Sequence, residues 1–153
     1  MRNLFTILLL ILTITCSSQT YISLMPTFST SQGTVAQRAG VALEVGKQLG
    51  PFSIGFDLGK TSLSNNDTTT YLEVRPNLNI FQQDKFTNTL TIGMGYVLRA
   101  EENVMTELST GIEYTPNKRF SYNIFFGTCY YSGVHSNSNE NYLAMSVMYY
   151  LKY

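Results

Sequence analysis

The chain has 153 residues, which is room for a single domain. Ten Lys and Arg side chains balance ten Asp and Glu, so the formal net charge is zero and no basic surface for nucleic acid is expected. Charged residues make up only 13% of the chain, about half the share in an ordinary soluble domain. One His and two Cys are too few for a zinc site without several carboxylates, and no cofactor is expected.

Residues 1–18 have the pattern of a secretory signal peptide. Arg2 supplies a short positive region, residues 4–14 form an apolar run, and Cys16-Ser17-Ser18 supplies small residues for cleavage. The apolar run is shorter than the roughly 20 residues that span a membrane, so a retained helical anchor is the weaker alternative. Cleavage after Ser18 predicts a mature domain at residues 19–153.

Cys16 raises a second interpretation of the leader, because a lipoprotein signal ends on a cysteine. The residues before it, Thr13-Ile14-Thr15, match that pattern poorly. Whether Cys16 is lipidated or removed stays open. In either case Cys129 has no cysteine partner within the cleaved chain, so no disulfide framework is expected.

From residue 20 onward the sequence alternates between apolar and polar side chains with a period of two. In residues 52–59, for example, Phe52, Ile54, Phe56 and Leu58 share one face, while small or charged side chains share the other. This alternation predicts eight β-strands of about ten residues. Their ranges are 20–28, 37–46, 52–59, 71–80, 89–98, 105–114, 120–130 and 142–153.

The connections between these strands alternate in length. Tight turns are predicted at Gly50-Pro51, at residues 82–85 and at residues 116–118, where turn-forming residues gather. Longer loops are predicted at 29–36, 62–69, 99–104 and 132–141. An even number of antiparallel strands then places all the turns at one end and all the loops at the other. Pro76 lies inside a strand, where a bulge or bend is expected.

The sequence also indicates which face of the sheet is inside. The polar face carries few charges and many glycines, which leave space for long neighbouring side chains in a narrow lumen. The apolar face continues around all eight strands, whose length suits a tilted membrane span. Tyrosines near strand ends on this face suit interfacial girdles, and they are Tyr96, Tyr114, Tyr122, Tyr130, Tyr149 and Tyr153.

These features predict an all-β fold, an eight-stranded antiparallel up-and-down transmembrane β-barrel with a filled polar lumen. Since lipid offers no partner for a sheet edge, the first and last strands must pair. The charged side chains expected in the lumen are Arg38, Glu44, Asp57, Glu73, Arg75, Glu107, Glu113 and Lys152. We interpret them as a packed ion-pair core, and the alternative is the lining of a pore. The excess of acids suggests that waters, hydroxyls or a protonated carboxyl contribute.

The signal peptide, the eight strands and the aromatic C-terminal Tyr149-Tyr150-Leu151-Lys152-Tyr153 resemble the small outer-membrane barrels of the OmpA-transmembrane-domain and OmpX group. The resemblance covers residues 20–153 and concerns architecture. It implies termini in the periplasm, loops outside the cell and insertion by the barrel-assembly machinery. From eight amphipathic strands behind a signal peptide we expect a monomer in contact with outer-membrane lipids and lipopolysaccharide, with a structural, adhesion or envelope-integrity role.

Two alternatives belong to other functional classes. A secreted soluble barrel would place the same apolar face inside, around a hydrophobic ligand. A membrane-embedded hydrolase is suggested by His135 with Ser136, Ser138 and Glu140, a Ser/His/acid set that resembles the lipid A deacylase barrels of the PagL type. The His-x-Ser spacing of that family is not kept, because Asn137 occupies the serine position. A solvated hydrophilic loop is therefore the preferred interpretation of this segment.

Overall fold

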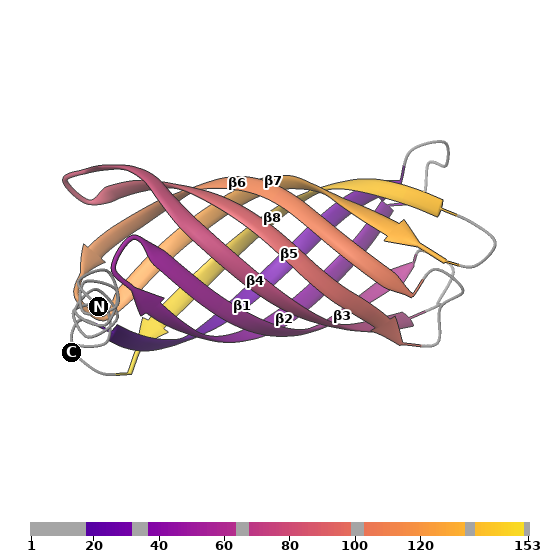
Figure 1. Cartoon of the computed structure of the whole chain (residues 1–153), viewed down its shortest axis with the longest axis horizontal. Helices are drawn as coiled ribbons and strands as arrows, with labels where there is room; N and C mark the ends of the chain where they lie inside the picture. The colour runs from indigo at the N-terminus through magenta and orange to yellow at the C-terminus, as the bar shows by residue number, and fades with distance from the viewer. Residues whose placement is uncertain (1–17, 32–36, 64–67, 99–102, 134–136, 152–153) are drawn as a thin grey trace, which may run out of the picture.

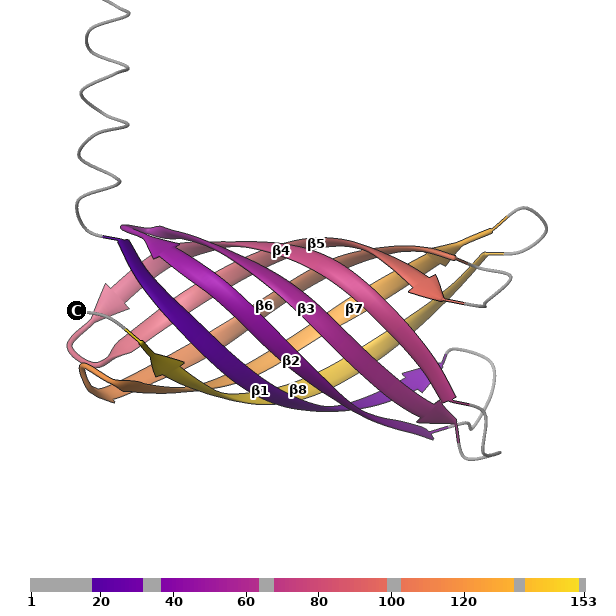
Figure 2. The ribbon, with the colours of Figure 1, turned by 90° about the horizontal axis from the view of Figure 1, so that it is seen from below.

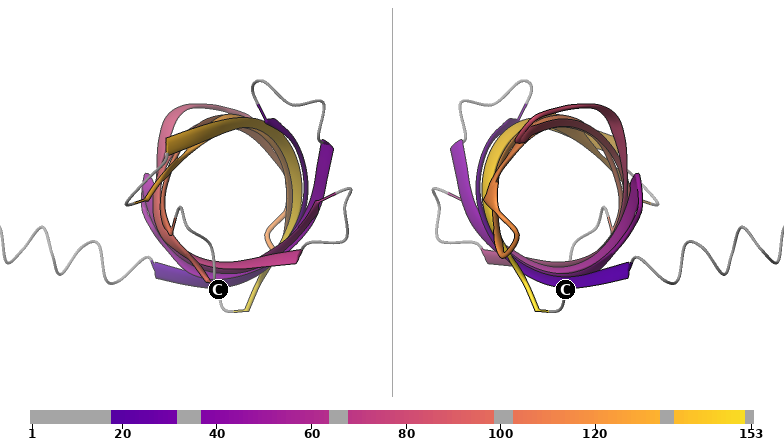
Figure 3. Two further views of the ribbon diagram at one scale, coloured as in Figure 1. Left: turned by 90° about the vertical axis from the view of Figure 1, so that its right-hand side faces the viewer. Right: turned by 90° about the vertical axis from the view of Figure 1, so that its left-hand side faces the viewer.

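The computed structural model describes residues 18–31, 37–63, 68–98, 103–133 and 137–151. The eight strands form one closed antiparallel barrel in sequence order, with β1 paired to β8 (Figures 1 and 3). The strands are β1 (Ser18–Ser31), β2 (Gln37–Leu49), β3 (Phe52–Leu63), β4 (Thr68–Gln83), β5 (Phe86–Leu98), β6 (Val104–Asn117), β7 (Phe120–Ser132) and β8 (Asn137–Tyr150). The fold class and the pairing of first and last strands are thus confirmed.

The predicted turns all lie at one end of the barrel. Residues 50–51, 84–85 and 118–119 join β2 to β3, β4 to β5 and β6 to β7, and β1 begins and β8 ends at the same end (Figures 1 and 2). Gly50 has φ of 65° and Asp84 has φ of 52°, so both turns use the left-handed region that Gly and Asp tolerate. We call this end the turn end and the opposite end the loop end.

The strands are longer than predicted, at 12 to 16 residues. Residues 29–31, 62–63, 68–69, 104, 132 and 137–141 belong to strands, so the loop-end connections shrink to 32–36, 64–67, 99–103 and 133–136. The predicted last strand is too long at Leu151, because β8 ends at Tyr150, and residues 152–153 lie outside the described residues. The sequence pattern did not predict these extensions because their side chains are mostly polar. Strand pairing continues there through backbone hydrogen bonds, although the apolar alternation has stopped.

Prolines interrupt the ladder on one side only. On one side Pro76 pairs with Ile54 of β3. On the other side, the pairing of β4 with β5 goes directly from Val74 to Asn77 and leaves Pro76 unpaired. The missing proline N–H explains the gap. The expected bulge lies beyond the proline, at a register shift between Asn79 and Phe81. The backbone therefore absorbs Pro76 without losing register there.

The apolar face is outside. Large apolar side chains are exposed on all eight strands, while the described carboxylates and Arg75 that face inward are buried. The alternative of a soluble barrel with an apolar interior is therefore wrong. The girdle tyrosines Tyr96, Tyr114, Tyr122, Tyr130 and Tyr149 are exposed as predicted, and Tyr153 lies outside the described residues.

Ring contacts at the turn end strengthen this girdle. Phe86 and Tyr114 lie with ring centroids 5.0 Å apart, and Phe120 and Tyr149 lie 5.2 Å apart. Each pair bridges neighbouring strands. Cross-strand aromatic pairs of this kind stabilise a sheet by roughly 0.2–1 kcal/mol each. They also place aromatic rings, two of them amphipathic tyrosines, together at one rim of the apolar wall.

Candidate functional site in the barrel lumen

Arg75 of β4 is the centre of the lumen. Its side chain is 1% exposed, and its guanidinium contacts carboxylates from three other strands. Nε and Nη2 donate to the two oxygens of Glu107 at 2.9 and 3.0 Å, a bidentate pair. Nη1 lies 3.0 Å from Glu44 Oε2 and 3.5 Å from Asp57 Oδ2. One cation thereby links β2, β3, β4 and β6.

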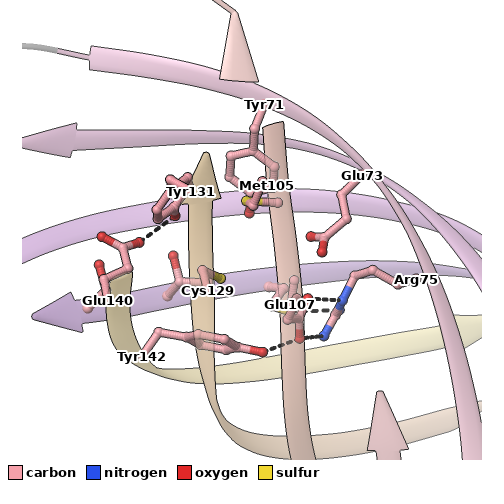
Figure 4. Close-up of a pocket in the computed structure, with 12 residues that line it drawn as sticks. Tyr71, Glu73, Arg75, Met105, Glu107, Cys129, Tyr131, Glu140 and Tyr142 are labelled. Atoms are coloured by element: carbon pink, nitrogen blue, oxygen red, sulfur yellow. Dashed lines mark hydrogen bonds and ion pairs between the residues drawn. The ribbon is translucent and has the colours of Figure 1, made fainter. Parts of the chain in front are cut away.

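Neutral groups complete the surroundings of this cluster. Ser109 donates to Glu107 at 2.5 Å. The Tyr142 hydroxyl also donates to Glu107, as Figure 4 shows. The guanidinium carbon lies 5.2 Å from the centroid of the Phe125 ring, in a cation–π arrangement. The expectation that hydroxyls help to hold the excess acids is confirmed at Glu107.

Glycines in the wall make room for these large inward side chains. Tyr71, Phe125 and Tyr21 pair across strands with Gly59, Gly111 and Gly46, and each ring covers the glycine opposite it. A Cβ on Gly55 would lie 2.5 Å from the Glu44 carboxyl carbon. The same holds for Gly93, whose Cβ would collide with Glu73. The prediction that glycines accommodate long lumen side chains is therefore confirmed.

The lumen holds more carboxylates than the Arg75 guanidinium balances. Glu44, Asp57 and Glu107 contact Arg75, and Glu73 is 3% exposed with an Oε1 that has no hydrogen-bond partner among the described residues. One further oxygen each of Glu44 and Asp57 is also buried without a partner there. Buried charges of this kind are tolerated only when they are paired, hydrated or protonated.

Two small cavities lie on either side of Arg75. The loop-end cavity has about 40 Å³ and is lined by Glu73, Glu107, Glu140, Cys129 and three tyrosines, among others (Figure 4). The turn-end cavity has about 10 Å³ and includes Glu113 and Asn77. Arg75 lines both cavities, so the ion-pair cluster separates them. Volumes of this size hold one to a few water molecules.

Most of the predicted lumen residues lie where alternation placed them. Glu44, Asp57, Glu73, Arg75 and Glu107 meet near the middle of the barrel. Glu113 lies nearer the turn end, where Thr115 and Tyr150 donate to it at 3.2 and 3.3 Å. The Arg38 side chain and Lys152 lie outside the described residues, so the prediction for these two is not tested.

Glu140 is a lumen residue that the sequence interpretation assigned to a loop. It is buried on β8, and the Tyr131 hydroxyl donates to it at 2.7 Å. Extending the alternation backward from Tyr142 and Ala144 would have placed it inside. Tyr21, Met25 and Phe125 are lumen side chains that the sequence interpretation placed on neither face, although they share the alternation of Ser23 and Asn123.

The Ser/His/acid set is not assembled in the described part of the structure. His135 and Ser136 lie outside it, Ser138 is exposed, and Glu140 is buried in the lumen. Among the residues that the structure describes, no cluster of His, Cys, Asp or Glu has the arrangement of a metal site. Within the same ranges there is also no helix long and apolar enough to cross a membrane.

Cys129 provides a direct test of the lumen assignment. It is buried on β7 as a free thiol, so we expect a bulky maleimide to label it at least about a hundredfold more slowly in the folded than in the unfolded protein, because labelling needs local opening. Gel mobility after timed labelling measures this rate. Ser132→Cys in a Cys129→Ser background is the exposed control and should label rapidly in both states. Fast labelling of folded Cys129 would contradict an inward thiol.

Comparisons with known proteins identify the fold. No protein-family model and no curated protein sequence matches the chain. Neisserial surface protein A (NspA) is similar with a TM-score of 0.61 at 9% identity, over 86% of this chain and 96% of that one. A de novo designed transmembrane β-barrel gives 0.57 at 11% identity, over 86% and 95%.

A third similar structure is the N-terminal β-barrel domain of OprF from Pseudomonas aeruginosa. Its TM-score is 0.55 at 8% identity, over 87% of this chain and all of that domain. At such low identities the likeness concerns the fold alone. The chain therefore has the closed eight-stranded architecture of small transmembrane β-barrels.

Proposed function

We propose that this protein is a small outer-membrane β-barrel with a structural, adhesion or envelope-integrity role and no open pore. The observation that carries the proposal is the continuous apolar outer wall around a lumen closed by the Arg75 cluster. A wall of this kind requires a lipid environment, since soluble monomers rarely expose such large apolar surfaces. The proposal assigns the protein no catalytic activity.

The strand lengths support a complete membrane crossing. A strand of 14 residues, such as β1 or β6, rises about 3.3 Å per residue and, at a tilt of about 40°, reaches roughly 35 Å along the barrel axis. The apolar band of such barrels is about 25 Å tall. Several ångströms of polar strand therefore project into water, which suits a role carried by the loop end.

The route of export and assembly is part of the same proposal. We propose that the signal peptide directs export and that the barrel-assembly machinery inserts the chain into the outer membrane, as in the OmpA and OmpX group. The termini and turn end would face the periplasm, and the loop end would face lipopolysaccharide and the exterior. The closed β1–β8 seam leaves no strand edge for pairing with another copy, which supports a monomer.

Membrane fractionation combined with a heat-shift gel tests this proposal. We expect the protein, expressed with its signal peptide, to enter the outer-membrane fraction and to migrate differently before and after boiling, because the hydrogen-bonded barrel resists detergent until heated. Leader cleavage is scored on the same gel. Recovery from the soluble periplasm without a heat-dependent shift would overturn the proposal.

A further inference from the structure

A groove on the outer wall crosses β5, β6 and β7. Its volume is about 570 Å³, within the range of small-molecule sites. It is lined by Phe86, Asn88, Thr110, Gly111, Ile112, Tyr114, Tyr122, Ile124 and Phe126. Asn88, Thr110 and Gly111 therefore leave a hollow among the larger side chains of this part of the wall.

The groove contains a polar group at an unusual place. The exposed side-chain amide of Asn88 has no hydrogen-bond partner among the described residues, whereas the neighbouring Thr110 hydroxyl donates to the Thr89 carbonyl at 3.0 Å. Asn88 lies two residues from the start of β5, about 5 Å along the barrel axis below the Phe86 and Tyr114 rings. With the Phe86 and Tyr114 rings at the interface, where girdle aromatics lie, Asn88 is just on its hydrocarbon side, next to the ester groups of the lipids.

The turn-end rim of the groove is basic. Lys85 directly precedes Phe86, and its carbonyl accepts a hydrogen bond from Thr115 N of β6 at 2.8 Å. Lys118 and Arg119 form the turn that leads into β7. All three side chains are exposed, and Asp84 is the acidic residue of the same two turns. The net charge of these turns therefore favours an anionic group beside the rim.

We propose that this groove binds an anionic phospholipid of the surrounding bilayer. One acyl chain lies in the apolar hollow, the phosphate lies near Lys85 and the Lys118-Arg119 turn, and the Asn88 amide donates to an ester carbonyl. The basic rim matches the phosphate, the depth of Asn88 matches the ester group, and the hollow matches the acyl chain of the same lipid molecule. This inference rests on the proposed membrane location and adds a selective lipid site to it.

Quenching by brominated lipids tests the site, because the chain contains no Trp and a single introduced indole is a unique reporter. Tyr122→Trp places the reporter at the groove, and Phe28→Trp places a matched reporter at a second outer groove, whose lining has no charged residue. Both variants are refolded into vesicles of phosphatidylcholine and phosphatidylglycerol, with one lipid brominated at a time.

We expect the Tyr122→Trp reporter to prefer phosphatidylglycerol about fivefold over phosphatidylcholine, the preference that one well-placed cation gives, and the Phe28→Trp reporter to show none. Adding Lys85→Gln and Lys118→Gln should abolish the preference. Adding Thr110→Phe, which fills the hollow, should also lower it. If the preference for phosphatidylglycerol persists in the Thr110→Phe variant, the charges at the rim alone explain it, and the groove site is overturned.

Three other results would overturn the inference. Equal quenching of both reporters by both lipids would mean that ordinary bilayer lipid covers the groove. A Tyr122→Trp reporter shielded from every brominated lipid, beside a quenched Phe28→Trp reporter, would mean that a second copy of the chain covers it. If neither reporter is quenched by any lipid, the proposed membrane location itself fails, which distinguishes this result from loss of selectivity alone.

Discussion

Replacing Arg75 by methionine is expected to destabilise the folded barrel by about 3–5 kcal/mol, the usual effect of removing one partner from a buried ion pair. Glu44, Asp57 and Glu107 would lose the cation that each contacts within 3.5 Å. The variant also loses the cation–π contact with Phe125. Denaturant unfolding in detergent, followed by the heat-sensitive gel shift, measures the change.

Three further variants separate the causes of this effect. Arg75→Lys keeps the charge but loses the bidentate geometry with Glu107, so an intermediate destabilisation is expected. Adding Glu107→Gln to Arg75→Met removes one stranded carboxylate and should restore part of the loss. Lys60→Gln alters an exposed cation on the outer wall and should change stability by no more than about 0.5 kcal/mol. If the Arg75→Met variant unfolds at the same denaturant concentration as the unaltered protein, the cluster does not stabilise the folded barrel.

The course of each strand through the apolar band was predictable because two independent patterns agree there. At residues 52–59 the alternation and the turn at Gly50-Pro51 specify the same face and the same strand start. At the loop end one pattern disappears. Asn137, Ser138 and Asn139 look like loop residues, yet they continue β8 because their backbone pairs with β7. Local residue type does not report on such cross-strand pairing.

The candidate site was predictable in composition but not in geometry. Alternation placed Arg75, Glu73 and Glu107 inside, but it did not say that Arg75 would gather carboxylates from three strands. That information lies in the register between strands, for instance Gly55 opposite Arg75 and Gly93 opposite Glu107. Each glycine leaves space for the side chains around its cross-strand partner. Register depends on all the turns and bulges together, so a single strand does not reveal it.

A second large effect is expected when a charge is placed in the middle of the outer wall. Leu43 is the central residue of β2, is 48% exposed, and pairs with Leu24 of β1 and Leu58 of β3. We expect Leu43→Arg to destabilise the barrel in lipid vesicles by about 2–4 kcal/mol, the effect of an arginine at the midplane of a bilayer. Denaturant titration in the vesicles measures it.

Two matched variants identify the cause as depth in the membrane. Leu43→Ala removes the leucine without adding charge and gives the part of the effect due to lost packing. Phe52→Arg adds the same charge at the first residue of β3, beside the Gly50-Pro51 turn, where a cost of only about 0–1 kcal/mol is expected. The difference between Leu43→Arg and Phe52→Arg therefore reports the hydrocarbon around β2. If the wall were in contact with water, each arginine would change the free energy of unfolding by no more than about 0.5 kcal/mol, because an exposed charge there keeps its hydration.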